Sequence, residues 1–262
     1  MLTINEYVKV KSLEEAYELN QKKTNRIIGG MLWLKMSTLR VQTAIDMSGL
    51  SLDNIEETDE EFKIGAMTTL RQLETNESLN NYTNGAIRES VRHIVGVQFR
   101  NSATIGGSIY GRYGFSDVLT MFLALDSYVE LYKGGIVPLS EFAKMKADRD
   151  IIVNIIVKKK PLKCVYMSER ISKTDFPVLA VCVSECDGKF IASVGARPAR
   201  AEAITDCEGI LSNGINAESA EKFGKYVTEK LNFNSNMRGS AEYREHLSKV
   251  LVKRAVMALG GK

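Results

Sequence analysis

Residues 100–117 read RNSATIGGSIYGRYGFSD, in which a short apolar run ends in a glycine pair. The same arrangement occurs earlier in the chain, so that IIGG occupies 27–30 and TIGG occupies 104–107. In both segments, β-branched residues predict the end of a strand, followed by a turn without side chains whose consecutive N–H groups could bind a phosphate. Two ordinary turns explain the pattern equally well, because glycine is common in tight turns of every kind.

The composition is that of a globular chain. It has 262 residues, 44% of them hydrophobic, which is enough for one large core or for two to three small ones. Lysine plus arginine number 35 and aspartate plus glutamate 32, so the net charge of +3 indicates neither a nucleic-acid partner nor a membrane partner. No apolar stretch approaches the roughly 20 residues that cross a bilayer, and the first residues form no apolar leader. We therefore expect a cytoplasmic protein.

The residue types that usually carry catalysis are sparse. His93 and His246 are the only histidines, and neither H-E-x-x-H nor C-x-x-C occurs. This argues against a Ser-His-Asp triad, a zinc site and an iron–sulfur cluster on this chain. We expect no catalytic residue and no metal ligand, and we expect the cysteines to be buried free thiols. The cysteines are Cys164, Cys182, Cys186 and Cys207.

The familiar nucleotide-binding motifs are also absent. No two glycines are separated by a single residue, and no Gly-Lys pair is followed by Ser or Thr. These absences exclude the G-x-G-x-x-G fingerprint and the P-loop. A dinucleotide would therefore need a scaffold other than the Rossmann fold.

Periodicity predicts two α/β portions followed by a strand-rich portion with a helical tail. In the first portion, EYVKV and NRII read as strands around a helix that begins at Ser12, and MLWLKM reads as a buried turn of helix. In the last portion, three strand-like runs with a hairpin signal at Asp187-Gly188 precede two amphipathic helices. The expected domains are 1–53, 54–160 and 161–262.

Further elements are expected inside the second portion. NIEE and FKIGA read as a strand pair, a helix is expected over 85–95, and another begins after Asp117. The stretch YVELYKGGIVPL reads as a hairpin that turns at Lys133-Gly134-Gly135. This third glycine pair has alternating strand residues on both sides, so we assign it a turn and no ligand.

The stretch RNSATIGGSIYGRYGFSDVLTMFLALDSYVEL resembles the FAD-binding subunit or domain of the molybdenum hydroxylases, a family that includes xanthine dehydrogenase and the carbon monoxide dehydrogenase medium subunit. The family pattern reads approximately RN-x-ATIGGN, seven residues, SD, then LLALDA-x-VEL, and seven residues also separate Ser108 from Ser116 here. The resemblance covers nearly the whole chain. Its other segments are RIIGGMLWLKM, FKIGAMTTLRQLE, IRESVRHIVGVQFRN, TDFPVLAV, VGARPARA and SAEYREHLSKVLVKRA.

The resemblance implies an α+β fold with three parts. Two α/β FAD-binding subdomains would be of the non-Rossmann type found in vanillyl-alcohol oxidase and carbon monoxide dehydrogenase flavoproteins. A C-terminal domain of antiparallel sheet and helices, like that of the carbon monoxide dehydrogenase flavoprotein, would follow.

The resemblance also implies a set of positions that bind FAD non-covalently. The backbone of the first glycine segment would meet the diphosphate from one side, and the second glycine segment would meet it from the other. Asp117 would accept a hydrogen bond from a ribose hydroxyl, as an ionised carboxylate can, although Ser116-Asp117 also suits a helix start. The implied positions are Ile27, Ile28, Gly29, Gly30, Met31, Thr104, Gly106, Gly107, Ser108, Ile109, Asp117 and Ile152.

The sequence departs from the family pattern at three of the positions that surround the cofactor. Met31 stands where Thr, Ser or His is usual, Ser108 replaces Asn, and Met167 stands where many members carry a lysine. We expect Trp33 to pack in the core, and we consider a stacking or gating role for Tyr110 and Tyr113.

The function implied by the resemblance is electron transfer. A molybdopterin subunit would oxidise the substrate, an iron–sulfur subunit would carry [2Fe–2S] clusters, and FAD on this chain would pass electrons to NAD⁺ or another acceptor. The partners would thus be two further polypeptides, with no nucleic acid and no membrane. Two alternatives stay open, namely a scaffold subunit that has lost FAD and a stand-alone flavin oxidoreductase.

Overall fold

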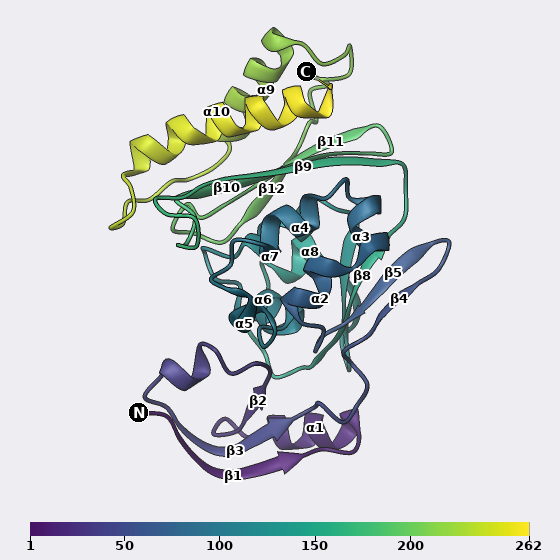
Figure 1. The fold of residues 1–262 in the computed structure, drawn as a ribbon, viewed down its shortest axis with the longest axis vertical. Coiled ribbons are helices and arrows are strands. Elements are labelled where there is room, and N and C mark those ends of the chain that lie inside the picture. The colour runs from purple at the N-terminus through teal and green to yellow at the C-terminus, as the bar shows by residue number, and fades with distance from the viewer. Residues whose placement is uncertain (262) are drawn as a thin grey trace. The chain divides into compact units, whose positions relative to one another are not determined.

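The computed structural model describes residues 1–261. The chain forms two compact units, each assembled from separate stretches of sequence. Both units combine helices with sheets (Figure 1), which confirms the expected α+β class. The division into domains at 1–53, 54–160 and 161–262 stays a prediction. Unit 1 comprises Met1–Gln72, Val97–Gly111 and Ser127–Lys158, and unit 2 comprises Leu73–Gly96, Arg112–Asp126 and the residues from Lys159 onward.

The first sheet of unit 1 is parallel and three-stranded. Its spatial order is β1-β3-β2, so the last strand in sequence is central. Helix α1 (Leu13–Asn20) connects the outer strands and buries Ala16 in a small core with Val10, Ile45 and Met47. The expected strand, helix and strand at the start of the chain are confirmed. The strands are β1 (Thr3–Lys9), β2 (Arg26–Ile28) and β3 (Arg40–Asp46).

The helix start predicted at Ser12 is confirmed. The Ser12 hydroxyl accepts the Glu15 N–H at 3.1 Å, which satisfies a donor that the helix itself leaves without a partner. The Glu15 carboxylate reaches back to the N–H of Lys11 at 2.7 Å instead of that of Ser12. The cap therefore fixes the turn between β1 and α1.

The second sheet of unit 1 is antiparallel and has the order β4-β5-β8-β6-β7. The predicted strand pair and hairpin both form, and Gly135 occupies the hairpin turn with φ 68°. Helices α5 (Val97–Arg100), α6 (Ile105–Gly111) and α8 (Leu139–Phe142) belong to the same unit. The strands are β4 (Ile55–Glu57), β5 (Glu61–Gly65), β6 (Ser127–Leu131), β7 (Gly135–Pro138) and β8 (Ile152–Lys158).

The second glycine segment does not follow a strand, so that expectation is wrong. Thr104 forms only an isolated bridge with Thr69, and α6 begins at Ile105. The N–H of Ile105 donates to Thr68 O at 2.9 Å, and the N–H of Gly106 donates to Ala66 O at 2.9 Å. The segment is therefore held by the neighbouring chain and continues as helix.

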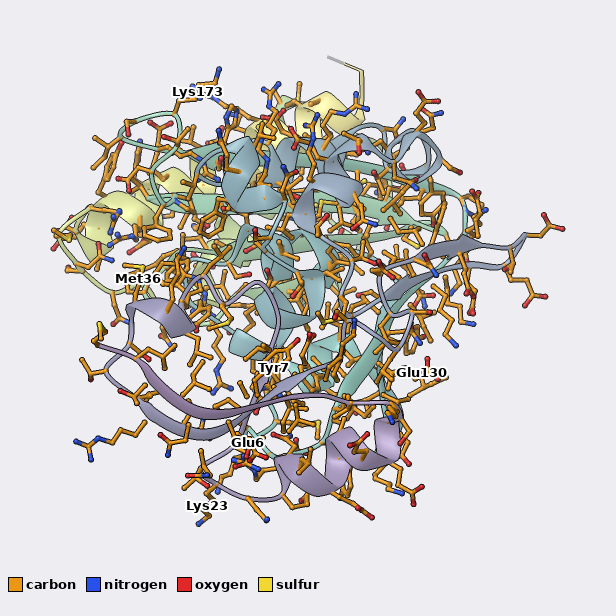
Figure 2. All side chains as sticks on the ribbon, turned by 60° about the horizontal axis from the view of Figure 1, so that its bottom comes forward. Glu6, Tyr7, Lys23, Met36, Glu130 and Lys173 are labelled. Atoms are coloured by element: carbon orange, nitrogen blue, oxygen red, sulfur yellow. The ribbon has the colours of Figure 1, made fainter. Side chains whose placement is uncertain are left out.

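The MLWLKM stretch also differs from its prediction. It forms a single 3₁₀ turn, η1 (Leu34–Met36), and is not buried, because 39% of Trp33 and 72% of Met36 are exposed. Met36 lies at the outer edge of this turn (Figure 2). Apolar composition alone did not identify a core segment here.

Unit 2 is built on an antiparallel sheet of order β12-β11-β10-β9. Helices α9 (Ala217–Glu229) and α10 (Ala241–Leu259) cover one face, and α4 (Ala86–Val91) and α7 (Asp117–Leu123) cover the other (Figure 1). Both C-terminal helices are where periodicity placed them, whereas α4 is shorter than the expected 85–95. The strands are β9 (Leu162–Glu169), β10 (Leu179–Cys186), β11 (Lys189–Gly195) and β12 (Glu202–Thr205).

Two remaining helices complete the structure. Helix α2 (Leu70–Thr75) runs from unit 1 into unit 2, and α3 (Glu77–Tyr82) follows it. The predicted Asp187-Gly188 turn is confirmed, since both residues have positive φ, at 50° and 74°. Within residues 1–261, no helix has both the length and the apolar character needed to cross a bilayer.

A buried arginine organises the start of α10. The Arg244 side chain is fully buried, and its guanidinium donates to Val178 O, Asn234 O, Gly239 O and Asn236 Oδ1 at 2.5–2.9 Å. Burial lowers the pKa of Arg244 from its ordinary value. One side chain thus joins β10 to the loop that precedes α10.

We expect Arg244→Met to lower the free energy of unfolding by about 3 kcal/mol, because it leaves several buried oxygens without donors. Arg254→Met on the same helix, where the side chain is exposed, should change the free energy by less than about 0.5 kcal/mol. Urea denaturation of the three proteins measures both effects, and equal stability of the two variants would contradict the assignment.

Candidate cofactor site

Unit 1 contains a cavity of about 570 Å³. Its walls come from both glycine segments, the end of β3, the segment after β5 and the loop before β8. A volume of this size suits a small organic ligand or part of a larger one. The apolar side chains of the wall are those of Ile27, Met47, Ala66, Met67, Ala147, Ile151 and Ile152.

The two glycine segments lie against each other. A Cβ on Gly30 would come within 1.8 Å of the Ser102 carbonyl oxygen, and a Cβ on Gly29 within 2.8 Å of Thr104 Oγ1. No real side chain fits at such distances, so the glycines are required for this approach. The structure therefore brings together two segments that the sequence singled out separately.

The first glycine segment carries two consecutive N–H groups without a partner. Neither the N–H of Gly30 nor that of Met31 donates to another group among residues 1–261. Met31 has φ 58°, the left-handed conformation that lets successive N–H groups converge on an anion. Gly30 and Met31 do not line the cavity themselves, but they directly follow the lining residue Gly29.

The second glycine segment contributes space instead of donors. Its N–H groups are already used, since Gly107 donates to Thr104 Oγ1 at 3.2 Å and Ser108 to Thr104 O at 3.1 Å. A Cβ on Gly107 would meet only Thr104 Oγ1, at 3.1 Å, and otherwise open space. The segment therefore forms a wall that a ligand can approach closely.

The predicted positions fall into three groups. Five predicted positions of the two glycine segments do not line the cavity, namely Ile28, Gly30, Met31, Ser108 and Ile109. Ile28 and Ile109 are buried in the core, and the Ser108 hydroxyl donates to Thr104 O at 2.9 Å. Asp117 belongs to unit 2. Those that line the cavity are Ile27, Gly29, Thr104, Gly106, Gly107 and Ile152.

Sequence reasoning missed the clamp formed by Arg149. Its guanidinium donates to the carbonyl oxygens of Lys22 at 2.7 Å and Asn25 at 2.9 Å and also to that of Asn20. In return, the Asn20 amide donates to Arg149 O at 2.9 Å. Arg149 and Asn20 both line the cavity. The clamp joins the turn before β2 to the loop before β8, and no local motif signals it because more than a hundred residues separate the partners.

The charged lining residues favour an anion. Lys23, Arg26 and Arg149 line the cavity beside Asp148 and Asp150. The Asp150 carboxylate is engaged by the backbone N–H groups of Lys133, Gly134 and Ile151. Three cations stand against two carboxylates, so the charged lining residues carry a net charge of +1, which suits a negatively charged ligand.

The aromatic candidates lie in different places. Tyr110 lines the cavity, whereas Tyr113 belongs to unit 2 and stacks on Phe115 with 5.2 Å between ring centroids. Met167 packs against the core of unit 2.

Three of the four thiols are buried, as predicted. Cys207 is exposed, so the prediction is wrong at that position. Burial raises the pKa of Cys164 to about 12, which keeps it a neutral thiol. Among residues 1–261, no three His, Cys, Asp or Glu side chains are grouped so that they could hold a metal ion.

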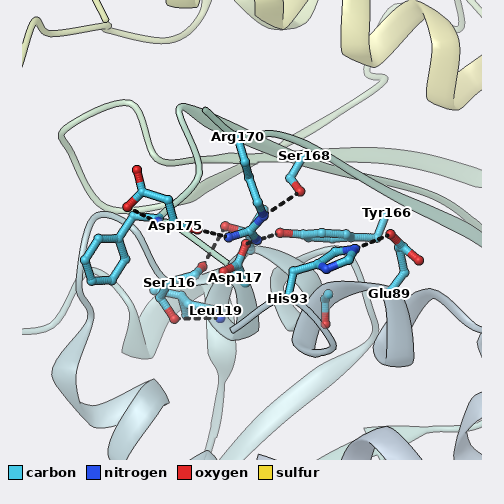
Figure 3. Close-up of polar contacts among 12 residues, drawn as sticks. Glu89, His93, Ser116, Asp117, Leu119, Tyr166, Ser168, Arg170 and Asp175 are labelled. Carbon is cyan, nitrogen blue, oxygen red and sulfur yellow. Dashed lines mark hydrogen bonds and ion pairs between the residues drawn. The ribbon is translucent and has the colours of Figure 1, made fainter. Parts of the chain in front are cut away.

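Asp117 lies in a buried polar cluster (Figure 3). Its Oδ1 accepts from the Tyr166 hydroxyl and from Arg170 Nη2 at 2.6 Å, and 5% of its side chain is exposed. The helix cap is Ser116, whose hydroxyl accepts the Leu119 N–H at 3.1 Å. Burial raises the pKa of Asp117, and the neighbouring Arg170 and Tyr166 oppose that shift. The role of Asp117 toward a ribose stays a prediction.

The residues of unit 1 fit the FAD that the family resemblance implies. Side-chain-free walls permit close approach, two unpaired N–H groups and nearby cations suit a diphosphate, and the apolar lining suits a planar ring. Ile27, Thr104 and Ile152 would hold the ligand by contact.

Arg170→Met should lower the free energy of unfolding by about 3–5 kcal/mol, because it leaves the Asp117 carboxylate buried without its cation. The variant should recover stability as pH falls. The reason is that a carboxyl whose pKa is raised in the folded protein stabilises the fold when protonated, and this contribution is lost as pH rises through that pKa. Urea denaturation at acidic and neutral pH measures this, with Tyr166→Phe, expected to cost only about 1 kcal/mol, for comparison. A loss that does not change with pH would contradict the account.

Comparison with known proteins agrees with this geometry. The model of the FAD binding domain in molybdopterin dehydrogenase matches residues 2–159, and that of the CO dehydrogenase flavoprotein C-terminal domain matches residues 170–259. The uncharacterized protein YgfM of Escherichia coli (strain K12) is 26% identical over 255 residues, covering 95% of this chain and 94% of YgfM.

One further relative and one solved structure match nearly the whole chain. The nicotine 6-hydroxylase medium subunit of Paenarthrobacter nicotinovorans is 23% identical, covering 98% of this chain and 97% of that subunit. A chain of reconstituted CO dehydrogenase from Oligotropha carboxidovorans has the same fold, with a TM-score of 0.86 at 20% identity over 99% of this chain and 98% of that one. The chain described here therefore belongs to the family of FAD-binding medium subunits of the molybdenum hydroxylases and is an oxidoreductase subunit.

Proposed function

We propose that this chain is the cytoplasmic electron-transfer subunit of a heteromeric molybdenum hydroxylase. It would receive electrons from [2Fe–2S] clusters on an iron–sulfur subunit, while a molybdopterin subunit oxidises the substrate. When bound, FAD supplies the chemistry that passes these electrons to NAD⁺ or another acceptor. The relative that is named a medium subunit of nicotine 6-hydroxylase supports a role inside a larger assembly.

One observation carries the cofactor part of the proposal. The two glycine segments meet at a cavity, and the N–H groups of Gly30 and Met31, directly after the lining residue Gly29, make no hydrogen bond within residues 1–261. We assign the diphosphate to these donors. Thr104, Gly106 and Gly107 would form the wall on the other side of the diphosphate, and Ile152 would pack against the ligand.

The residues of this chain bind, position and shield the ligand. Arg149 holds the turn before β2, so the loop that carries the donors starts from a fixed position. Ile27, Met47 and Ile152 would exclude water from the part of the ligand that they cover. We assign no catalytic acid or base to the lining residues, and the chemistry would belong to the cofactor.

The direct test of FAD binding is the visible absorption spectrum of the purified chain, followed by identification of the released chromophore. A flavin spectrum with released FAD is expected. A chain that stays colourless after incubation with FAD, without a shift in melting temperature, would instead support a scaffold that has lost its cofactor.

The assembly is tested by isolating the native complex and measuring iron and molybdenum. Both metals are expected, together with two further polypeptides. Turnover of a substrate by this chain alone would support the stand-alone oxidoreductase. Anaerobic reduction of the bound flavin by NADH would identify NAD⁺ as an acceptor.

Gly107→Leu should weaken FAD binding at least about tenfold while preserving the fold. The reason is that the new side chain occupies cavity space, whereas leucine is a better helix former than glycine by up to about 1 kcal/mol. Titration with FAD and thermal denaturation of the ligand-free protein measure the two effects separately. Gly106→Ala is the comparison variant, since its Cβ would come within 2.6 Å of Ala66 O and should destabilise the fold itself. If Gly107→Leu binds FAD with normal affinity, Gly107 does not belong to the FAD site.

A further inference from the structure

Residues 31–39, MLWLKMSTL, form an apolar surface on unit 1, which we call the apolar turn. Six of these nine residues are large and apolar, and none of the nine is buried. The exposed fractions are 39% for Trp33, 72% for Met36 and 43% for Leu39. Single apolar residues are common on protein surfaces, but a contiguous group of them marks a surface that another molecule covers.

The backbone of the apolar turn is held by hydrogen bonds. The N–H of Ser37 donates to Leu34 O at 3.0 Å, and the Ser37 hydroxyl donates to the same oxygen at 2.7 Å. The N–H of Thr3 donates to Leu39 O at 3.0 Å, which joins the end of the turn to β1. The exposed side chains are therefore presented by a fixed loop, and a surface that is fixed before binding loses little freedom when a partner covers it.

The apolar turn adjoins the N–H donors that we assign to the diphosphate. Its first residue is Met31, and the N–H of Lys35 donates to Met31 O at 2.9 Å. Met36 lies at the outer edge of the turn (Figure 2). A molecule that covers the turn therefore lies beside the loop proposed to bind FAD.

Two cations accompany the apolar side chains. Lys35 and Arg40 are exposed, and neither side chain makes an ion pair or a hydrogen bond within residues 1–261. Protein interfaces are enriched in Trp, Met and Arg, and charges at their rims select the partner by complementarity. The surface thus fits a partner that offers an apolar pocket with carboxylates at its rim.

The direction of electron flow decides between the two partner polypeptides of the proposed complex. Electron transfer between two cofactors slows steeply as their separation grows, so the cluster that reduces FAD must lie close to it. The molybdopterin subunit passes its electrons to the clusters and needs no contact with FAD. The surface beside the FAD loop therefore suits the subunit that carries the clusters.

We propose that the apolar turn is the docking surface for the iron–sulfur subunit, an inference that rests on the proposed function. Trp33, Met36 and Leu39 fill an apolar pocket on that subunit, and Lys35 and Arg40 face carboxylates at the rim of the pocket. The contact holds a cluster beside the loop assigned to the diphosphate.

Photo-crosslinking in the native complex identifies the occupant of this surface. Met36→p-benzoylphenylalanine should crosslink under ultraviolet light to the polypeptide that carries the clusters, recognised by mass spectrometry and by its iron. The same replacement at Met237, a methionine of unit 2 that is 91% exposed, measures the background. A crosslink from position 36 to the molybdopterin subunit or to a second copy of this chain would overturn the proposal, as would a yield no higher than that background.

Met36→Asp tests the strength of the contact. The concentration at which half of this chain has separated from the iron–sulfur subunit should rise at least about tenfold, because a charge replaces an apolar side chain in a desolvated pocket. Since Met36 is largely exposed, the melting temperature and the FAD affinity of the free chain should not change. Mass photometry of the diluted complex measures the separation, and Met237→Asp is the matched control. If Met36→Asp separates at the same concentration as the unaltered complex, the proposal is wrong.

Lys35→Glu tests the charges at the rim. It should weaken the association about 3- to 10-fold at low ionic strength, and the loss should shrink as salt is added, because salt screens exposed charges. Lys173→Glu, at an exposed lysine of unit 2, is the control and should have no effect. An unchanged association in Lys35→Glu at low ionic strength would contradict an acidic rim on the partner.

The proposed function and the docking surface fail in different ways. If the unaltered complex contains no iron, the proposed function fails. If the complex contains iron and FAD but Met36→Asp keeps its full iron content and its stability to dilution, the function stands and the docking surface lies elsewhere.

Discussion

Close contact between backbones is the constraint on which unit 1 depends. The Cα of Gly30 approaches the Ser102 carbonyl, and the Cα of Gly106 approaches that of Ala66, at distances that no Cβ would allow. Three segments from distant parts of the sequence can therefore meet directly. Without these contacts, side chains would separate the segments, and the cavity between them would lose its walls.

Unit 2 depends on buried polar groups in a comparable way. Arg244 is satisfied by four neutral oxygens and the Asp117 carboxylate by a guanidinium and a phenol. Burying such groups is costly unless each has partners, so each also specifies where its partners must lie. The Arg244 cluster holds the start of α10 against the antiparallel sheet, and the Asp117 cluster does the same for the start of α7. The loops before these helices are thereby held in one conformation, which apolar packing alone would leave variable.

Local patterns predicted much of the fold. The Ser12 cap, the Asp187-Gly188 turn and the amphipathic C-terminal helices all follow from interactions within a few residues, which is why they were found. The local glycine pattern singled out both glycine segments, and the resemblance then identified the FAD-binding family. The structure corrected the segment at 104–107, where hydrogen bonds to 66 and 68 override the strand-like sequence. It also corrected MLWLKM, whose apolar residues are partly exposed. The Arg149 clamp could not be predicted, since its partners have no local relation in sequence.

The interleaving of the two units has a consequence for synthesis on the ribosome. The chain passes between the units five times, after Gln72, Gly96, Gly111, Asp126 and Lys158. A nascent chain cannot complete the first unit until Lys158 has emerged, and helices α3 and α4 must wait for strands that are made still later. Their apolar side chains stay uncovered during that interval. This polypeptide should therefore depend on chaperones during translation more than a protein with continuous domains does. Neither the N-terminal nor the C-terminal half of the sequence should fold as an excised fragment.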